Sequence, residues 1–317
     1  MTTFSLFHLP LVALEHVLYI MNPYELINLS LTSTKSKRAV KRIKPKFSAS
    51  LEIHSDLSIS ISKTDESWSY KWISYKPRLG YIEATSTEQY VYKFSKNPIE
   101  EMMKFYDYIR EVLKCQLDHV GFELGSDSSK NKRITDCLRS YPITRLDISN
   151  DDKETDEDMK YAVSNITVID KMTLDISNYK EDFQMEIPAT PYEIFIDESS
   201  FINFEQLLRL KNRRIFLYES CVTEKEINLF VKSWMARESH LELEAFNIDV
   251  SGEEAMDVIM DLPHKKTADP NVVEIFREKF YGLRIEEGFD IERSDGKLAT
   301  LGYGDHSDGP RFFMLIR

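Results

Sequence analysis

The feature that most constrains the fold is a dense series of apolar segments within the first 46 residues. One apolar segment follows Leu9-Pro10, a second follows Asn22-Pro23, and a lysine-rich segment then runs to Pro45. Proline fits the first turn of a helix, because its fixed φ is helical and its missing N–H would have no partner there. The pattern therefore predicts three short helices, the last of which Pro45 would end.

The apolar residues of these helices outnumber what so short a segment can bury. In the first helix they recur at helical spacing, at Leu11, Leu14, Val17, Leu18 and Met21. Val12 and Ile20 lie off that stripe, so the helix is apolar over more than one face. A domain of fewer than about 40 residues seldom forms a core of its own. Two alternatives are open: the helices pack on the following region, or a partner protein covers them.

Two helix starts in this segment are well specified. Asn22 is a good N-cap, and Glu25 stands where the acid of a capping box is expected. Ser33 or Thr34 would cap the third helix. The basic residues that follow are interpreted as a solvated helix face, with a nuclear-localisation or nucleic-acid patch as the alternative. They are Lys35, Lys37, Arg38, Lys41, Arg42, Lys44 and Lys46.

Residues 4–45 resemble an F-box of the nematode type. The resemblance is carried by Leu9-Pro10, Val17-Leu18, Pro23 before a Leu-Ile run, and Ser30-Leu31-Thr32-Ser33 before the lysine-rich helix. It implies binding to the Skp-family adaptor of a cullin–RING ubiquitin ligase, with Leu9 and Pro10 touching the adaptor directly. Five further residues would divide between the adaptor interface and the packing of the F-box itself: Leu14, Val17, Leu18, Leu26 and Leu29.

After Pro45 the apolar pattern changes from helical spacing to alternation. Period-two alternation is typical of half-buried strands, and it recurs in short runs up to Phe94. A few antiparallel strands are therefore expected between 47 and 95. Pro98 then opens a segment with apolar residues at intervals of three and four, which predicts a helix.

From about residue 118 a unit of one strand followed by a turn and a helix, or a helix-length loop, repeats along the chain. The second residues of successive strand cores are 20 to 28 residues apart, within the range of leucine-rich repeats. The strict leucine pattern is not kept, so we predict a degenerate, leucine-rich-repeat-like α/β array; an ordinary α/β domain is the alternative. The predicted strand cores are Val120/Phe122, Leu146/Ile148, Leu174/Ile176, Ile194/Ile196, Ile215/Leu217 and Leu241/Leu243.

Two helices of the array have clear starts. Asn203 begins one, and Thr223 with Glu226 forms a capping box for the other. Trp234 falls on the apolar face of the second helix and is interpreted as a core residue. Residues 223–235 and 290–300 resemble two signatures of the type 2 F-box-associated domain, whose implied role is substrate recognition. The second signature contains a tight Asp-Gly turn between two strands, and a last strand is expected at 312–316.

The predicted organisation is an F-box at 1–46 and an F-box-associated, leucine-rich-repeat-like domain at 47–317. The alternating segment 47–95 either belongs to that domain or forms a separate β-rich start. The fold class is α+β/α/β: a small three-helix module, then strands, then the α/β array.

Composition limits the classes of function. A formal charge of −12 argues against general binding to nucleic acid. Three widely spaced cysteines indicate free thiols in a reducing compartment, and neither a secretory signal nor a membrane span is expected. We therefore expect a protein of the cytoplasm and/or nucleus.

No pattern for catalysis, a cofactor or a metal stands out. The seven histidines form no zinc-binding pair, and no P-loop or nucleophile elbow occurs. The acidic stretch 151–158 lacks the glycine of a calcium loop and predicts a solvated loop or a helix start. Gly302-Tyr303-Gly304 is too short for a dinucleotide loop. We predict a protein that is not an enzyme and needs no cofactor.

The expected function is that of a substrate-recognition subunit of a ubiquitin ligase, joined through the adaptor to a cullin. The alternative is a binding protein that sequesters a partner without ubiquitin transfer. The residues that bind the target are unknown; Tyr218, Glu219 and Asn247 are candidates, as exposed residues just after strand cores. The arginines at 209, 213 and 214 form the only arginine cluster of the array, so phosphate recognition is not favoured.

Overall fold

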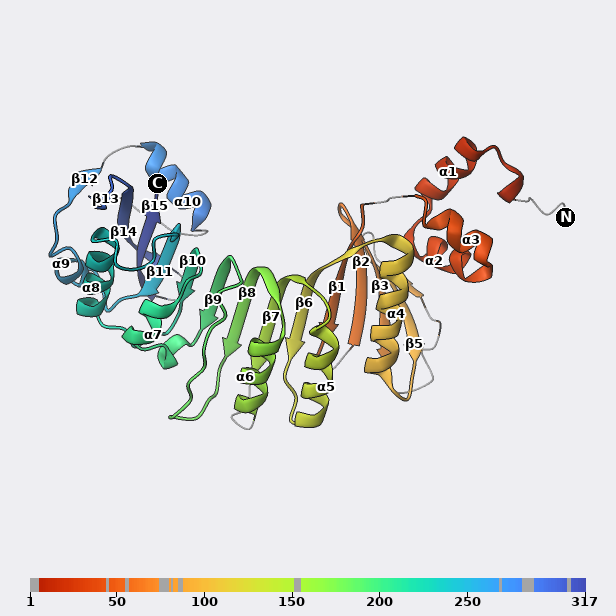
Figure 1. Cartoon of the computed structure of the whole chain (residues 1–317), viewed down its shortest axis with the longest axis horizontal. Helices are drawn as coiled ribbons and strands as arrows, with labels where there is room; N and C mark the ends of the chain where they lie inside the picture. Colours follow the sequence, from red (N-terminus) through yellow and green to blue (C-terminus); the bar gives the residue numbers. More distant parts are fainter. Residues whose placement is uncertain are drawn as a thin grey trace. The chain divides into compact units, whose positions relative to one another are not determined.

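The computed structural model describes residues 6–43, 46–54, 57–73, 80, 82–84, 88–150, 155–267, 270–280, 288–306 and 309–317 (Figure 1). The chain divides into two compact units, Met1–Glu123 and Leu124–Arg317, each of which is described by itself. Within the described ranges, no helix is both long and apolar enough to cross a bilayer.

The three predicted N-terminal helices are present. A short 3₁₀ turn at Leu6–His8 precedes α1 (Leu11–Ile20), α2 (Pro23–Thr32) and α3 (Thr34–Val40). Asn22 and Glu25 form the predicted capping box, since each side chain accepts a hydrogen bond from the other residue's backbone N–H at 2.9 Å. Ser33 caps α3 by accepting from the Ser36 N–H at 3.1 Å. Pro45, the predicted helix stop, lies outside the described residues.

The remainder of the first unit is a mixed sheet with one long helix. Its strand order is β6-β1-β2-β3-β5-β4. The pairs β1–β2, β2–β3 and β4–β5 are antiparallel as predicted, whereas β3–β5 and β1–β6 are parallel. The β3–β5 pair is parallel because β4 lies on the outer edge of β5, which turns β5 back into the direction of β3. The elements are β1 (Ser48–Ile53), β2 (Leu57–Lys63), β3 (Glu66–Ile73), β4 (Ile82–Ala84), β5 (Glu88–Phe94), α4 (Pro98–Leu113) and β6 (Gln116–Glu123).

The helix predicted at Pro98 is α4, and it contacts β2 and β3. Phe105 of α4 makes edge-on ring contacts with Tyr70 at 4.8 Å and Trp72 at 5.8 Å. Small polar residues occupy the alternate positions of the strands: Ser50, Ser60 and Ser69 lie in register across β1, β2 and β3. One face of this sheet therefore contributes to the core, and the other carries polar side chains.

The helix α2 packs against this sheet and α4. The Tyr24 hydroxyl lies 2.7 Å from both the Ser69 and the Gln89 carbonyl oxygens, and its ring meets Tyr70 at 5.0 Å. The Ser30 and Tyr108 hydroxyls are 2.8 Å apart. Burial raises the pKa of Tyr24, as expected for a phenol enclosed by protein. One side of the N-terminal helices is thus covered by the same chain.

The second unit is a sheet in which five parallel strands follow one another in chain order. Its strand order is β7-β8-β9-β10-β11-β15-β14-β13-β12. The described pairs from β7 to β11 are parallel, and those from β11 through β15 to β12 are antiparallel. The strands are β7 (Ile143–Asn150), β8 (Val168–Ile176), β9 (Glu193–Asp197), β10 (Arg214–Leu217), β11 (Ala245–Asp249), β12 (Lys265–Thr267), β13 (Gly288–Glu292), β14 (Leu298–His306) and β15 (Gly309–Ile316).

Helices connect three of the four successive pairs of parallel strands, and a loop at 177–192 joins β8 to β9, which fits the predicted unit of a strand followed by a helix or a helix-length loop. Both predicted helix starts are confirmed: Asn203 caps α7 and Thr223 caps α8, each within a capping box. Trp234 of α8 is fully buried, also as predicted. The helices are α5 (Ser128–Leu138), α6 (Asp156–Asn165), α7 (Phe204–Arg209), α8 (Glu224–Met235), α9 (Ala255–Ile259) and α10 (Pro270–Lys279).

Five of the six predicted strand cores lie in strands, and the sixth is wrong. Leu241 and Leu243 lie in a turn and loop before β11, which begins at Ala245. Leu241 and Leu243 alternate like strand residues but form no strand, because the chain is still turning after α8. Arg237 and His240 both have left-handed φ values in this turn. The residues that follow belong to this loop until the chain joins β10 in register.

The two faces of the second sheet differ in their cover. Phe230 of α8 contacts Phe246 of β11 at 4.5 Å, so α8 packs on the face of Phe246. The opposite face of β10, β11 and β15 is covered by α10, through a cluster of Phe216, Ala245, Val272, Phe276, Phe280, Phe313 and Leu315. On β7 and β9 the residues that alternate with buried ones are only partly buried or exposed, so this second face is open there.

Replacing Tyr24 by Phe should destabilise the first unit. The single hydroxyl proton lies between a buried and a partly buried carbonyl, and its loss should lower the free energy of unfolding by about 1–2 kcal/mol. Urea unfolding measures this, with Tyr19→Phe as the control because Tyr19 is 55% exposed. Equal midpoints for the two variants would contradict the docking of α2 described above.

Stability should fall as the pH is lowered from about 6.5 towards 4, in part through His240. Burial lowers the pKa of His240 from 6.5 to about 4, so in this window the unfolded chain binds a proton that the folded chain does not. His240→Asn suits the left-handed φ of 51° and removes that proton. As the pH falls, the natural protein should lose more unfolding free energy than this variant. Urea midpoints of the two proteins that change by the same amount across the window would refute this.

Candidate functional site

The helix α1 carries the largest apolar exposure in the first unit. Val12 is 79% exposed and Ile20 71% exposed, and Leu11, Tyr19 and Leu31 are also largely exposed. Exposed apolar area of this kind marks an interaction surface. The sequence pattern indicated this excess through the off-stripe positions Val12 and Ile20, although the predicted adaptor residues did not include them.

The seven predicted adaptor-binding residues fall into two groups. Leu18 and Leu26 are each 1% exposed and contribute to the packing of the unit itself. Pro10 is exposed, whereas four residues are partly buried: Leu9, Leu14, Val17 and Leu29. The structure therefore brings part of the predicted set to the surface together with Leu11, Val12 and Ile20.

The basic residues of α3 are partly engaged within the same unit. Lys37 and Lys41 lie 2.8 and 3.1 Å from the Glu111 carboxylate of α4. Their hydrogen bonds lower the pKa of Glu111. Lys35 lies over the Phe7 ring at 5.0 Å. These contacts agree with the interpretation of a solvated helix face.

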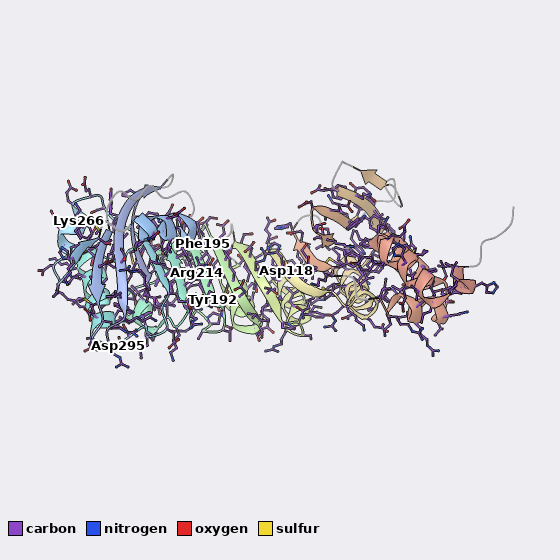
Figure 2. The ribbon with its side chains drawn as sticks, turned by 90° about the horizontal axis from the view of Figure 1, so that it is seen from above. Asp118, Tyr192, Phe195, Arg214, Lys266 and Asp295 are labelled. Carbon is purple, nitrogen blue, oxygen red and sulfur yellow. The ribbon has the colours of Figure 1, made fainter. Side chains whose placement is uncertain are left out.

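In the second unit, the open sheet face carries ordered rows of side chains. The strand register places Lys171, Glu193 and Arg214 in one row and Thr173, Phe195 and Phe216 in the next. Glu193 lies 3.0 Å from Lys171 and 2.7 Å from Arg214, which balances the charge of the first row. Figure 2 labels Phe195 and Arg214 on this part of the ribbon.

The three candidate target-binding residues differ in exposure. Glu219 is exposed and Tyr218 is partly buried. Asn247 is buried, so its prediction as an exposed contact is wrong. The reason is that β15 pairs with β11 and brings Arg311 close: Nε of Arg311 donates to Oδ1 of Asn247 at 2.7 Å.

Arg311 is a buried cation that joins residues of two neighbouring strands. Its Nη2 donates to the Leu217 carbonyl at 2.8 Å, and its Nη1 lies 2.7 Å from Oδ1 of Asp249. The guanidinium also lies 3.4 Å from the centroid of the Tyr218 ring. Burial raises the pKa of Asp249, and the charge of Arg311 opposes that shift. This side chain links β15 to both β11 and β10.

The arginine cluster of the array does not present free cations. Arg209 pairs with Glu186 at 3.1 Å, and Arg213 pairs with Glu242 at 3.1 Å. Arg214 pairs with Glu193. These ion pairs agree with the expectation that phosphate recognition is not favoured.

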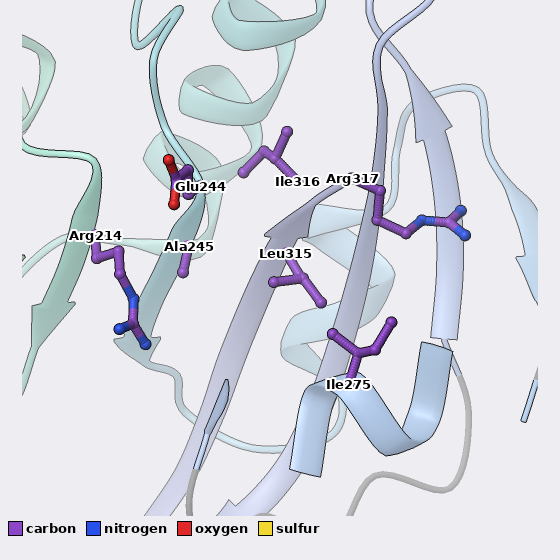
Figure 3. A pocket seen from close by; sticks show the side chains of 7 residues that line it. All are labelled: Arg214, Glu244, Ala245, Ile275, Leu315, Ile316 and Arg317. Atoms are coloured by element: carbon purple, nitrogen blue, oxygen red, sulfur yellow. The ribbon is translucent and has the colours of Figure 1, made fainter. Parts of the chain in front are cut away.

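A cavity of about 360 Å³ lies on the α10 side of the second sheet (Figure 3). Ala245, Leu315 and Ile275 of α10 form much of its apolar lining. Glu244, Ile316 and two arginines complete the lining; Figure 3 shows Arg214 and Arg317 on opposite sides of the view. This volume lies near the lower end of the range for ligand pockets.

The described residues offer no group of three or more His, Cys, Asp or Glu side chains suited to hold a metal ion. Of the acidic stretch, residues 151–154 lie outside the described part. Asp156 and Asp158 are buried at the start of α6, where Asp158 accepts hydrogen bonds from Ser128 and Asn131 at 2.7 and 2.8 Å. The segment Gly302–Gly304 lies within β14. These motifs have structural roles.

Replacing Arg311 by Met should destabilise the second unit strongly. The Arg311 side chain is 1% exposed, whereas that of Asp249 is 27% exposed. Removal of Arg311 leaves Asp249 without its cation and two buried acceptors, Oδ1 of Asn247 and the Leu217 carbonyl, without their donor, which costs about 3–5 kcal/mol. Urea unfolding of Arg311→Met is compared with Arg317→Met, because the pair of Arg317 with Asp290 is about one quarter exposed and should matter by about 1 kcal/mol or less. Similar midpoints for the two variants would show that the Arg311 contacts do not hold the strands.

Two segments of the chain match models of known domain families. A model of the F-box domain matches residues 6–48, which cover α1 to α3. A model described as F-box associated matches residues 182–248, which include β9, α7, β10 and α8. The signature at 223–235 lies inside that match, and the one at 290–300 lies outside it. Neither the curated proteins nor the solved structures gave a match. The chain therefore contains one segment that matches an F-box domain and a second segment that matches an F-box-associated domain.

Proposed function

We propose that this protein is the substrate-recognition subunit of a cullin–RING ubiquitin ligase. The F-box would bind a Skp-family adaptor and, through it, a cullin, while the C-terminal region binds a target protein. The observation that carries this proposal is the combination of the two family matches with an exposed apolar helix inside the F-box match.

We assign the adaptor interface to α1 and its neighbours. Leu9, Pro10, Leu14, Val17 and Leu29 would contact the adaptor, together with the exposed apolar residues of α1. Leu18 and Leu26, which are buried in this unit, would support the interface by holding the helices in place. Next to α1 in the sequence, α2 is held against the sheet by the Tyr24 hydroxyl.

The protein would act by proximity. Holding a target next to a ubiquitin-charged enzyme raises the effective concentration of the target's lysines and so favours transfer and degradation. The transfer chemistry would belong to other subunits of the ligase, so this chain needs no catalytic group or cofactor of its own. Widely spaced cysteines suit the reducing cytoplasm and/or nucleus.

We propose the layout 1–46 for the F-box and 47–317 for the F-box-associated domain. Within the latter, the parallel strands β7 to β11 and their connecting helices support a leucine-rich-repeat-like array. Each strand with its helix leaves an apolar face that its neighbours cover, which is the property that makes repeats stack.

The test is a pull-down of the full chain with a purified Skp-family adaptor. We expect the natural protein to bind, and Leu9→Ala/Pro10→Ala and Val12→Asp/Ile20→Asp each to weaken binding by about 100-fold, because two apolar contacts worth about 1.4 kcal/mol each together account for that factor. The matched control is Leu229→Asp, which places the same charge on an apolar residue of α8 that is 52% exposed.

The outcomes separate the functions. Adaptor binding that both double variants lose, and the control keeps, would support a ligase subunit. A natural protein that binds no adaptor would refute the proposal and leave sequestration of a partner, without ubiquitin transfer, as the function to pursue.

A further inference from the structure

The open face of the second sheet has an apolar centre with no covering element over β9 among the described residues. Phe195 of β9 is only partly buried, and its ring centroid is 4.5 Å from that of Tyr218. Both rings adjoin the cluster under α10, so they extend that apolar surface beyond the helix. Ile169, near the start of β8, is 56% exposed.

The cavity adjoins this centre at the beginning of β10. Arg214 of its lining is the first residue of β10, and Ala245 and Leu315 follow it in register across β11 and β15. The charged lining is already balanced: Arg214 pairs with Glu193, Arg317 with Asp290, and Glu244 with Arg213. A side chain that enters the cavity therefore needs no charge of its own, and apolar side chains fit its walls.

The other end of the same strands is acidic. Glu198 and Glu219 stand at equivalent positions after β9 and β10, in the matching segments Ile194–Ser199 and Ile215–Ser220. Together with Asp197, they have no cationic partner within the described ranges. Burial raises the pKa of Glu198, and the charges of Glu219, Asp197 and Asp175 add to that rise. The carboxylates are thus close enough to repel one another.

We propose that the open face of β9 and β10 binds an extended segment of the target protein, with an apolar side chain in the cavity beside α10 and Lys or Arg at the strand-end carboxylates. The aromatic pair Phe195 and Tyr218 forms the surface between these two ends. The proposal rests on the proposed function, because it assumes that the C-terminal region binds a target.

The spacing of the two ends sets the expected sequence of the segment. Arg214 and Glu219 are five residues apart, and a strand advances roughly 3.3 Å per residue, so the ends lie within about 16 Å of each other. An extended peptide has the same advance per residue. A basic residue about five positions from the apolar anchor therefore reaches the carboxylates.

The probe is a phage-displayed library of random 12-residue peptides, selected on the full chain in complex with its adaptor. Selected peptides should be enriched in Leu, Ile, Phe or Trp with Lys or Arg about five positions away. A synthetic, fluorescein-labelled copy of the most enriched peptide then serves for anisotropy titrations. Selection of no peptide, or of peptides without basic residues, would overturn the proposal.

Two variants test the two ends separately, and a third serves as the control. Ile275→Lys places a charge in the cavity wall at a residue 38% exposed, and Asp197→Lys/Glu219→Lys reverses the acidic end. Each should weaken peptide binding by about tenfold or more. The matched control is Glu238→Lys, because Glu238 is an exposed carboxylate just after α8, which packs on the opposite face. Equal peptide affinity in all three variants would overturn the proposal.

Adaptor binding is measured on the same samples, so that the two proposals can fail independently. Variants that lose the peptide and keep the adaptor support the assigned face. A natural chain that binds no adaptor but binds the peptide, also in a selection repeated on the chain alone, refutes the ligase function and leaves the face intact. A dimeric chain that Ile275→Lys converts to a monomer would assign the face to a second copy and overturn the proposal.

Discussion

One-sided helical cover is the constraint on which the second unit depends. Parallel sheets are normally covered on both faces and are then apolar throughout their strands. In β7 and β9 the side chains instead alternate between fully buried and partly or fully exposed, so only one face requires a cover. Where β11 and β15 continue the sheet, apolar residues appear on the second face and α10 covers them. The change from an open to a covered second face occurs at β10. The partly buried rings of Phe195 and Tyr218 and the cavity lie beside this strand.

In the first unit, too, an apolar surface is covered only in part, here on the N-terminal helices. The segment has too much apolar surface for its length, and the chain covers one part of it with its own sheet and α4. The remaining part, on α1, stays exposed. The first of the two alternatives that the sequence left open, packing on the following region, is therefore realised for α2, and cover by a partner remains a proposal for α1. A module built in this way combines a helix packed on the chain's own sheet with a helix whose apolar residues are exposed, and exposed apolar helix faces are a recurring means of protein recognition.

Local signals in the sequence predicted the elements well, and long-range pairing limited the rest. Capping boxes at Asn22 and Thr223 depend on residues three apart, so their chemistry is visible in the sequence. The burial of Asn247 depends on Arg311, 64 residues away, which reaches it only because β15 returns beside β11. In the same way, alternation at Leu241 and Leu243 resembles a strand until the left-handed residues before it are known. Of the interaction site, the apolar excess was predictable, but not which residues α2 and the sheet would cover.

The two glutamates after β9 and β10 indicate how the architecture serves binding. Glu198 and Glu219 have φ values of 52° and 50°, a region that costs non-glycine residues about 1–3 kcal/mol each. Burial raises the pKa of Glu198, and the like charges of Glu219, Asp197 and Asp175 raise it further, so their repulsion adds to the cost. Neither residue recovers this cost through an ion pair with a described cation. Because successive strands of a parallel array lie in register, the same turn repeated after each strand sets such side chains in a row at one edge. A cationic segment of a partner would relieve the repulsion, so the two costs are consistent with a surface arranged for binding more than for folding.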